Sequence, residues 1–273
     1  MPHEPLVFGS FEIVPLCDGW APLPLAEEVP GRNVDWEEER RRYPWAFPSD
    51  AGEGWAWHVH AFLLRSPEGL VLVDTGIGRL GPPRYDVTGR IDEELQTVGT
   101  GPGEIDHVVY THLHADHSGG ACHPDGTPRF PNAVHHVHPG DWAFFGERRT
   151  PPGFTGRFAM AAIETEGILD LDPADREIVP GVRVAHAPGH TPGHRVVIID
   201  GEGDHLLLAG DLLHVPPQIV HPDWTSDHDE DPRAACEARA RWVEDARRER
   251  WLVAFSHFGV PFGRVEADGW TSI

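Results

Sequence analysis

Four potential metal ligands lie within six consecutive residues of this chain, and their spacing restricts how the chain can fold. They are His112, His114, Asp116 and His117. Their side chains cannot all face one way from a regular helix or strand, because these structures repeat about every 3.6 and 2 residues. A tight loop after the strand expected at 107–111 can bring them together, and the following Ser118-Gly119-Gly120 permits the turn. Imidazole and carboxylate groups together suit zinc, iron, manganese or cobalt, so this segment predicts a transition-metal site.

Three further potential ligands stand later in the chain, each at or near the end of an expected strand. They are His190, Asp211 and His257. Each of them alone fits a structural role at least as well. Together with the first cluster, however, they supply enough ligands for two ions about 3.5–4 Å apart. Asp211 is the natural bridge, because the two oxygens of one carboxylate can bind two ions. The sequence therefore predicts a two-metal centre.

Short apolar strands alternate with helical segments along most of the sequence. Strands are expected at 8–17, 58–65, 69–74, 107–111, 133–138, 182–186, 195–200, 205–210 and 252–256. Helical spacing and capping residues predict helices near 34–43, 91–98, 159–164 and 232–248. Because no repeat or linker interrupts this alternation, residues 1–273 are expected to form one layered α/β domain.

The segment 18–57 departs from this alternation. It is rich in proline and tryptophan and holds one short helical segment. Its many aromatic residues argue against disorder. We therefore expect an excursion from the core that serves as a lid or as a contact in a homodimer.

Composition limits the partners that this chain can have. A formal net charge of −22 disfavours nucleic acids and anionic membranes, because both attract positive charge. The chain has no lysine, which excludes Schiff-base chemistry and a phosphate-loop lysine. No apolar run is long enough to span a bilayer, and the three widely spaced cysteines suggest a reducing compartment. We therefore expect a small-molecule substrate, no nucleic acid or membrane partner, and a cytoplasmic location.

These motifs resemble those of the metallo-β-lactamase-fold superfamily, from about residue 59 to residue 265. The resemblance implies a four-layer βα/βα sandwich with its metals at one edge. It places one ion on His112, His114 and His190, the second on Asp116, His117 and His257, and Asp211 between them. Val73-Asp74-Thr75-Gly76 matches the family's first motif, whose buried aspartate orients metal-bound histidines. The implied cofactors are two divalent transition-metal ions, zinc first, with iron, manganese or cobalt as alternatives.

Within the superfamily, residues 210–215 and 257–269 are similar to methyl parathion hydrolase and the lactonase-like branch. Acyl-homoserine lactonases carry a tyrosine three residues after the bridging aspartate, where this chain has His214. The resemblance implies a hydrolase in which a hydroxide held by the metals attacks a neutral ester, lactone or phosphotriester. Asp116 and Asp211 are then candidates for proton transfer, and His214 for donation to the substrate or leaving group.

Two other functions stay open at this point. One is redox chemistry at iron, similar to that of sulfur dioxygenases on the same fold, although the presence of both ligand sets argues against it. The other is a metal-binding protein without catalytic activity, which the complete ligand sets disfavour.

Aromatic residues near the expected site are candidates for the walls of a substrate pocket. They are those of the 18–57 excursion, Trp142, Phe144, Phe145, Phe154, Phe158 and the 258–262 loop. Such walls suit an uncharged, partly apolar substrate. The remaining histidines are expected to be structural: His194 as a support for His190, His58 and His60 within a strand, and His221 and His228 in an acidic loop.

Overall fold

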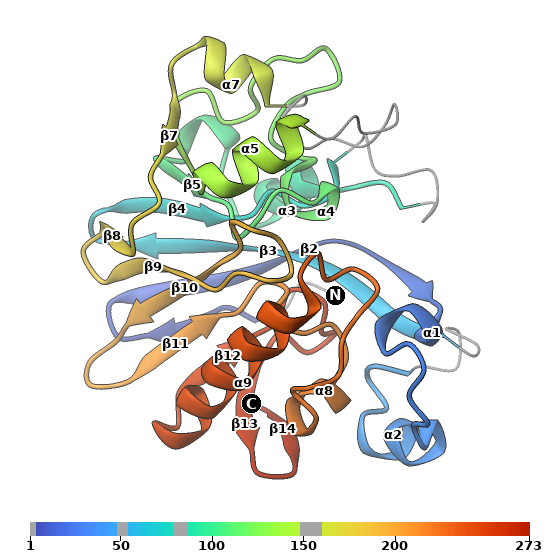
Figure 1. Cartoon of the computed structure of the whole chain (residues 1–273). Helices are drawn as coiled ribbons and strands as arrows, with labels where there is room; N and C mark the ends of the chain where they lie inside the picture. Colours follow the sequence, from blue (N-terminus) through green and yellow to red (C-terminus); the bar gives the residue numbers. More distant parts are fainter. Residues whose placement is uncertain (1–3, 48–53, 79–86, 148–159) are drawn as a thin grey trace.

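The computed structural model describes residues 4–47, 54–78, 87–147 and 160–273, and within these ranges the strands form two seven-stranded sheets (Figure 1). The first sheet follows chain order and consists of β1 (Leu6–Phe8), β2 (Phe11–Leu23), β3 (Trp55–Ser66), β4 (Gly69–Val73), β5 (His107–Val109), β6 (Val134–Val137) and β7 (Leu169–Leu171). The second sheet has the order β14-β13-β12-β11-β10-β9-β8, with strands β8 (Arg176–Val179), β9 (Val182–His186), β10 (Arg195–Asp200), β11 (His205–Leu208), β12 (Leu252–Ala254), β13 (Phe262–Glu266) and β14 (Gly269–Ser272).

Helices cover the outer face of each sheet (Figure 1). Over the first sheet lie α3 (Ile91–Thr97), α4 (Ala115–Ser118), α5 (Pro139–Glu147), α7 (Ala161–Thr165) and a 3-10 helix, Pro102–Glu104. Over the second sheet lie α8 (Pro217–Val220) and α9 (Pro232–Arg248), while α1 (Leu25–Glu28) and α2 (Trp36–Arg42) follow β2. These layers confirm the expected four-layer α/β sandwich.

Three apolar clusters hold the layers together. Alternate residues of facing strands meet between the sheets, among them Ile13 of the first sheet and Val197 of the second. The other faces of the strands pack against helices, with Trp142 of α5 in the cluster over the first sheet and Trp242 of α9 in the cluster over the second. Each sheet is therefore buried on both faces, which explains the nearly continuous apolar runs of its central strands.

The carboxyl ends of the strands meet at one edge of the sandwich. Strands β4 to β7 are parallel to one another, as are β11 and β12. Strand β9 runs in the same direction as β11, because each is antiparallel to the β10 strand between them. The loops after β5, β9, β11 and β12 carry the predicted ligands, and this topology brings them to the same edge.

The first expected strand, 8–17, is two strands in the structure. β1 ends at Phe8, Gly9 turns the chain with a φ of 59°, and β2 runs from Phe11 through Leu23. Among the described residues, β1 pairs with residues 11–13 alone, so no described strand pairs with the rest of β2 on that side, and this edge tolerates Pro15 and Pro22.

The excursion from the sheet is shorter than the predicted 18–57. Leu23 of β2 pairs with Trp55 of β3, so the predicted ends at 18 and 57 both lie inside strands, and the segment between the two strands is 24–54. The strands β7, β8, β13 and β14 and the helix α5 had no counterpart in the sequence prediction. Among the described residues, no helix is both long and apolar enough to cross a lipid bilayer.

Candidate metal centre

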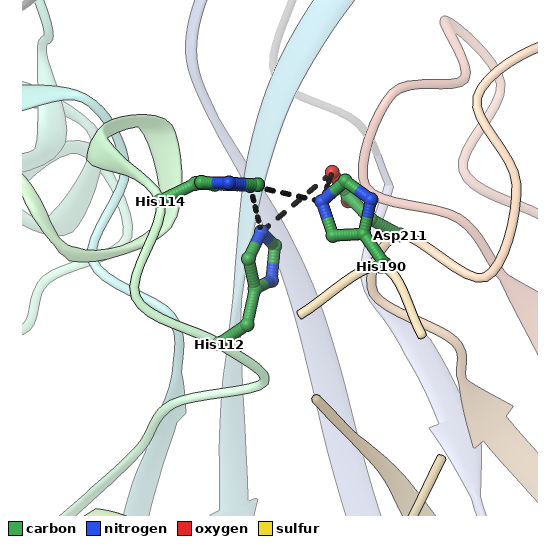
Figure 2. Close-up of side chains that lie close together, drawn as sticks. All are labelled: His112, His114, His190 and Asp211. Carbon is green, nitrogen blue, oxygen red and sulfur yellow. Dashed lines mark hydrogen bonds and ion pairs between the residues drawn. The ribbon is translucent and has the colours of Figure 1, made fainter. Parts of the chain in front are cut away.

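Side chains from three loops converge in a first group of four residues, His112, His114, His190 and Asp211 (Figure 2). His114 Nδ1 lies 3.0 Å from His112 Nε2 and 2.9 Å from His190 Nε2. The Oδ2 atom of Asp211 is 3.3 Å from His190 Nε2 and 3.8 Å from His112 Nε2. Nitrogens bound at about 2.0–2.1 Å to a tetrahedral zinc ion are themselves about 3.3 Å apart, so this group has the dimensions of a zinc ligand set.

A second group consists of Asp116, His117, Asp211 and His257. His117 Nε2 lies 3.3 Å from Asp116 Oδ2 and 3.2 Å from Asp211 Oδ1. His257 Nε2 lies 3.1 Å from Asp211 Oδ2 and 3.5 Å from Asp116 Oδ2. The structure therefore brings all seven predicted ligands together in two groups, and Asp211 belongs to both.

Two buried atoms at the centre of the site support the presence of a cation. In the described part of the chain, His117 Nε2 and Asp211 Oδ1 have no hydrogen-bond partner, although each is shielded from water. Leaving such atoms unsatisfied costs about 1–3 kcal/mol or more each. A metal ion between the ligands would satisfy both atoms at once, so these residues fit the two divalent ions that the sequence predicts.

The electrostatics of the site are those of a ligand set. Burial lowers the pKa of His112 and His114 well below the usual value, so both rings are neutral and offer a lone pair. Burial opposes ionisation of Asp211, yet the imidazoles of His117, His257 and His112 hold its pKa well below its usual range. His112 and His114 therefore offer neutral imidazoles beside an ionised carboxylate. Despite burial, Asp211, Asp116 and Asp74 raise the pKa of His117 well above its usual value.

Each of three candidate ligands is oriented through its second ring nitrogen. Asp74 Oδ2 lies 2.7 Å from His117 Nδ1, as the sequence predicted for this aspartate. Asp229 Oδ1 lies 3.3 Å from His190 Nδ1, a contact that the sequence prediction missed. A backbone carbonyl, that of His58, lies 2.6 Å from His257 Nδ1. Such partners fix the tautomer and the direction of a metal-bound imidazole.

His194 was expected to support His190, and the structure gives it a different contact. Its Nε2 accepts a hydrogen bond from the backbone N–H of Asp211 at 3.0 Å. Its Nδ1 lies 3.0 Å from the carbonyl oxygen of Ala187. His194 therefore holds the backbone of the shared aspartate in place.

Replacing Asp74 by asparagine is expected to weaken metal binding by about 10–100-fold without unfolding the protein. Asp74 has a φ of 60°, a conformation that asparagine also tolerates, and its Oδ1 accepts a hydrogen bond from the backbone N–H of Thr111. The Asp74 carboxylate accepts hydrogen bonds from Thr111 with one oxygen and from His117 with the other. The asparagine side chain has a single oxygen and cannot replace both. Competition with a fluorescent zinc chelator measures the affinity, and Asp106→Asn, beside β5, is the matched control. Equal affinities in the two variants would contradict the orienting role.

His214 lies at the inner wall of the site between two carboxylates. Its Nε2 is 3.2 Å from Asp211 Oδ2, and its Nδ1 is 3.2 Å from Glu28 Oε2. Burial disfavours a charged imidazole here, but Glu28 and Asp211 raise the pKa of His214 to about 10. His228 is the next ring outward, with Nε2 3.8 Å from Glu28 Oε1. The sequence prediction missed Glu28, and it did not foresee that His228, whose side chain is 28% exposed, lines the cavity.

A cavity of about 210 Å³ opens onto both ligand groups. Its lining residues are Leu23, Glu28, Trp57, His114, Ala115, Asp116, His190, Asp211, His214, Asp227, His228, Glu230 and His257. Trp57 is an aromatic wall of the predicted kind. Trp142 and Phe145 were expected to be walls too, but they are buried in the core over the first sheet. Phe258 is likewise buried, and Phe154 and Phe158 lie outside the described residues.

Comparison with known proteins agrees with this fold. N-acyl homoserine lactonase of Bacillus thuringiensis is 26% identical over 216 residues, which cover 73% of this chain and 80% of the lactonase. Among solved structures, AidC, a dizinc quorum-quenching lactonase in complex with a product, superposes with a TM-score of 0.83 at 23% identity, over 99% of this chain and 96% of AidC. The hydrolase AbOPH gives a TM-score of 0.84 at 22% identity, over 100% and 97%.

The sequence profile described as Metallo-beta-lactamase superfamily matches residues 54–257. That range covers most of the chain and contains every residue of the two ligand groups, from His112 to His257. By this match the chain belongs to the metallo-beta-lactamase superfamily.

Proposed function

We propose that this protein hydrolyses a neutral lactone or ester at a centre of two divalent metal ions, of which zinc is the first candidate. Phosphotriesters would be further substrates. The observation that carries the proposal is Asp211, whose carboxylate contacts members of both ligand groups at the floor of one cavity. A carboxylate in that position is typical of two-metal hydrolytic sites. The N-acyl homoserine lactonases and AidC, to which the chain is similar, support a lactone as the substrate.

When bound, the two ions would supply Lewis acidity and a water that ionises near neutral pH. The protein's own residues would orient the substrate around that water. His214 presents Nε2 to the cavity beside Asp211, so it is placed to donate to the substrate or the leaving group. The side chain of Asp116 is 17% exposed, so it is placed to accept a proton from an attacking water.

The shape of the cavity supports a small reacting group. At about 210 Å³ it is smaller than the roughly 300–1,000 Å³ of pockets that enclose a drug-sized ligand. A lactone ring or the carbonyl end of an ester fits this space, and the remainder of the substrate would extend along the rim. The segment 24–54 contributes Glu28 to the cavity, which favours a lid role for it over a homodimer contact.

The charge of the cavity supports a substrate without negative charge. Apart from Asp116 and Asp211, its lining includes the carboxylates of Glu28, Asp227 and Glu230, and none of the described lining residues is an arginine. Like charges repel an anionic substrate before it reaches the metals. We therefore expect nucleic acids and phosphate monoesters to be poor substrates.

A substrate panel tests the proposal. Zinc-loaded protein would be assayed on acyl-homoserine lactones, aryl esters, phosphotriesters, thioesters, β-lactams and phosphate monoesters. We expect the highest kcat/KM on a lactone or aryl ester, and loss of all hydrolysis on chelation. A phosphate monoester as the best substrate, or faster cleavage of a nucleic acid added to the panel, would overturn the assignment. Oxygen uptake by iron-loaded protein in the presence of a thiol persulfide would instead support an iron-dependent redox enzyme similar to sulfur dioxygenases.

Replacing His214 by alanine is expected to lower kcat about 100-fold and to leave both metals bound. The ring lies beside Asp211, but the seven ligand positions are filled without it. General acid or base groups contribute about 10²–10⁴-fold to turnover. Steady-state kinetics and elemental analysis of the same sample measure the two effects. His221→Ala is the matched control, because His221 is exposed and stacks on Trp224 outside the cavity. Loss of metal from His214→Ala would contradict its assignment as a residue that faces substrate.

A further inference from the structure

A second cluster of metal-ligating side chains lies outside the cavity. Ligand atoms of Cys17, His58 and His60 all lie within 4.8 Å of one another. None of these residues belongs to the two groups around Asp211. The mechanism proposed above has no use for a thiol, so this cluster requires its own explanation.

The register of β2 and β3 places the three side chains on one face of the sheet. Cys17 pairs with His60, and the ladder is irregular between Cys17 and Gly19, where Asp18 bulges out. Directly paired residues of antiparallel strands point to the same face. His58 precedes His60 by two residues on β3, so it shares that face. The two imidazoles stack with ring centroids 5.6 Å apart.

The distance between the sulfur and one imidazole nitrogen matches that of a metal site. Cys17 Sγ lies 3.6 Å from His58 Nδ1. Around a tetrahedral zinc ion, with bonds of about 2.3 Å to sulfur and 2.0–2.1 Å to nitrogen, a sulfur and a nitrogen ligand are about 3.6 Å apart. The sulfur and the nitrogen therefore already have the separation that zinc imposes.

His60 has the tautomer that a ligand needs. Its Nδ1 lies 3.0 Å from the carbonyl oxygen of Ser256, a partner that can only accept a hydrogen bond. The proton is therefore on Nδ1, and Nε2 keeps its lone pair. A ring nitrogen that donates to a backbone carbonyl while the other binds metal is the usual arrangement in zinc proteins.

We propose that Cys17, His58 and His60 bind a third transition-metal ion, and that this ion is zinc. Thiolate and imidazole together select zinc or copper over magnesium and calcium. Cys17 and His58 are only partly buried, so an ion can enter from solvent and keep a water as its fourth ligand.

Binding at this site exchanges a proton for the ion. Burial, with Glu94 nearby, raises the pKa of the Cys17 thiol to about 11, so the free thiol keeps its proton at neutral pH. The ion displaces that proton and a sulfur–zinc bond replaces the sulfur–hydrogen bond, as in other thiolate sites. One proton is released for each ion bound, and no oxidant is required.

Cobalt substitution tests the proposal independently of hydrolysis. The seven ligands around Asp211 contain no sulfur, so any thiolate-to-cobalt charge-transfer absorption in the near ultraviolet reports on a cysteine. We expect wild-type protein, freed of metal and titrated with Co(II), to develop this absorption with the intensity of one thiolate–cobalt site per chain and to reach saturation by three equivalents, when all three sites are filled. Cys17→Ser should abolish it and reduce the zinc content from three ions per chain to two.

Cys236→Ser is the matched control, because Cys236 is also a partly buried free thiol and belongs to none of the three ligand groups. That variant should keep the absorption and all three ions. His58→Asn provides a second route if Cys17→Ser is unstable, and it should also remove the absorption. Wild-type protein without the absorption, or Cys17→Ser that retains it, would overturn the proposal.

Discussion

Replacing Asp211 by alanine is expected to remove both metal ions and all hydrolytic activity together. Oδ1 of this carboxylate faces His117, and Oδ2 faces His190 and His257, so no other described residue belongs to both ligand groups. The pKa of water falls from 15.7 to about 7 on a catalytic metal ion, so losing the ions lowers the ionised fraction at neutral pH by roughly eight orders of magnitude. Elemental analysis and kcat/KM on the best substrate measure the two effects.

Asp227→Ala is the control for this experiment. Asp227 lines the same cavity with an exposed carboxylate but belongs to neither ligand group. This variant should keep its metals and most of its activity, which separates a missing bridge from a mere change in cavity charge. An Asp211→Ala protein that binds two ions with wild-type affinity would show that the groups do not share this residue.

Gly189→Ala is expected to destabilise the protein by about 3–5 kcal/mol. Gly189 precedes the candidate ligand His190 and has a φ of 137°, which side chains rarely adopt. A Cβ atom at this position would lie 2.0 Å from the backbone nitrogen of Ala235, at the start of α9. Backbone cannot move aside as a flexible side chain can, so the helix and the ligand loop must separate.

Urea denaturation of metal-free protein measures this effect without a contribution from bound ions. Gly103→Ala is the matched control, because its Cβ would meet only the Asn132 amide at an ordinary 3.6 Å. A difference between the two variants below about 1 kcal/mol would contradict the close approach of the His190 loop to α9.

The ligands were predictable because their signal is local. His112 to His117 form a dense motif, and His190, Asp211 and His257 each follow a strand of buried apolar residues. Strand ends are where polar side chains gather in layered α/β proteins, so the pattern predicts both the fold and the position of the site. The orienting role of Asp74 came from the family resemblance, and its 2.7 Å contact with His117 agrees with that role.

The residues around the ligands were not predictable, because distant segments bring them there. Glu28 contacts His214 because β2 and β3 extend as far as Leu23 and Trp55. This extension places α1, which carries Glu28, beside the cavity. His228 lines the cavity because the next residue, Asp229, contacts His190 and so holds this loop beside the candidate metal site. Trp142 and Phe145 were wrongly expected as walls, because sequence cannot tell which side of α5 packs on the sheet.

The most direct test of the two-metal centre is a crystal structure of the zinc-loaded protein with anomalous diffraction data on both sides of the zinc absorption edge. At the seven candidate ligands we expect two zinc peaks about 3.5–4 Å apart, with Asp211 in contact with both, and these two are separate from the third peak expected at Cys17. One peak should be bonded to His112, His114 and His190, and the other to Asp116, His117 and His257. A single zinc peak at this edge of the sheets, or two peaks of which only one touches Asp211, would contradict the account.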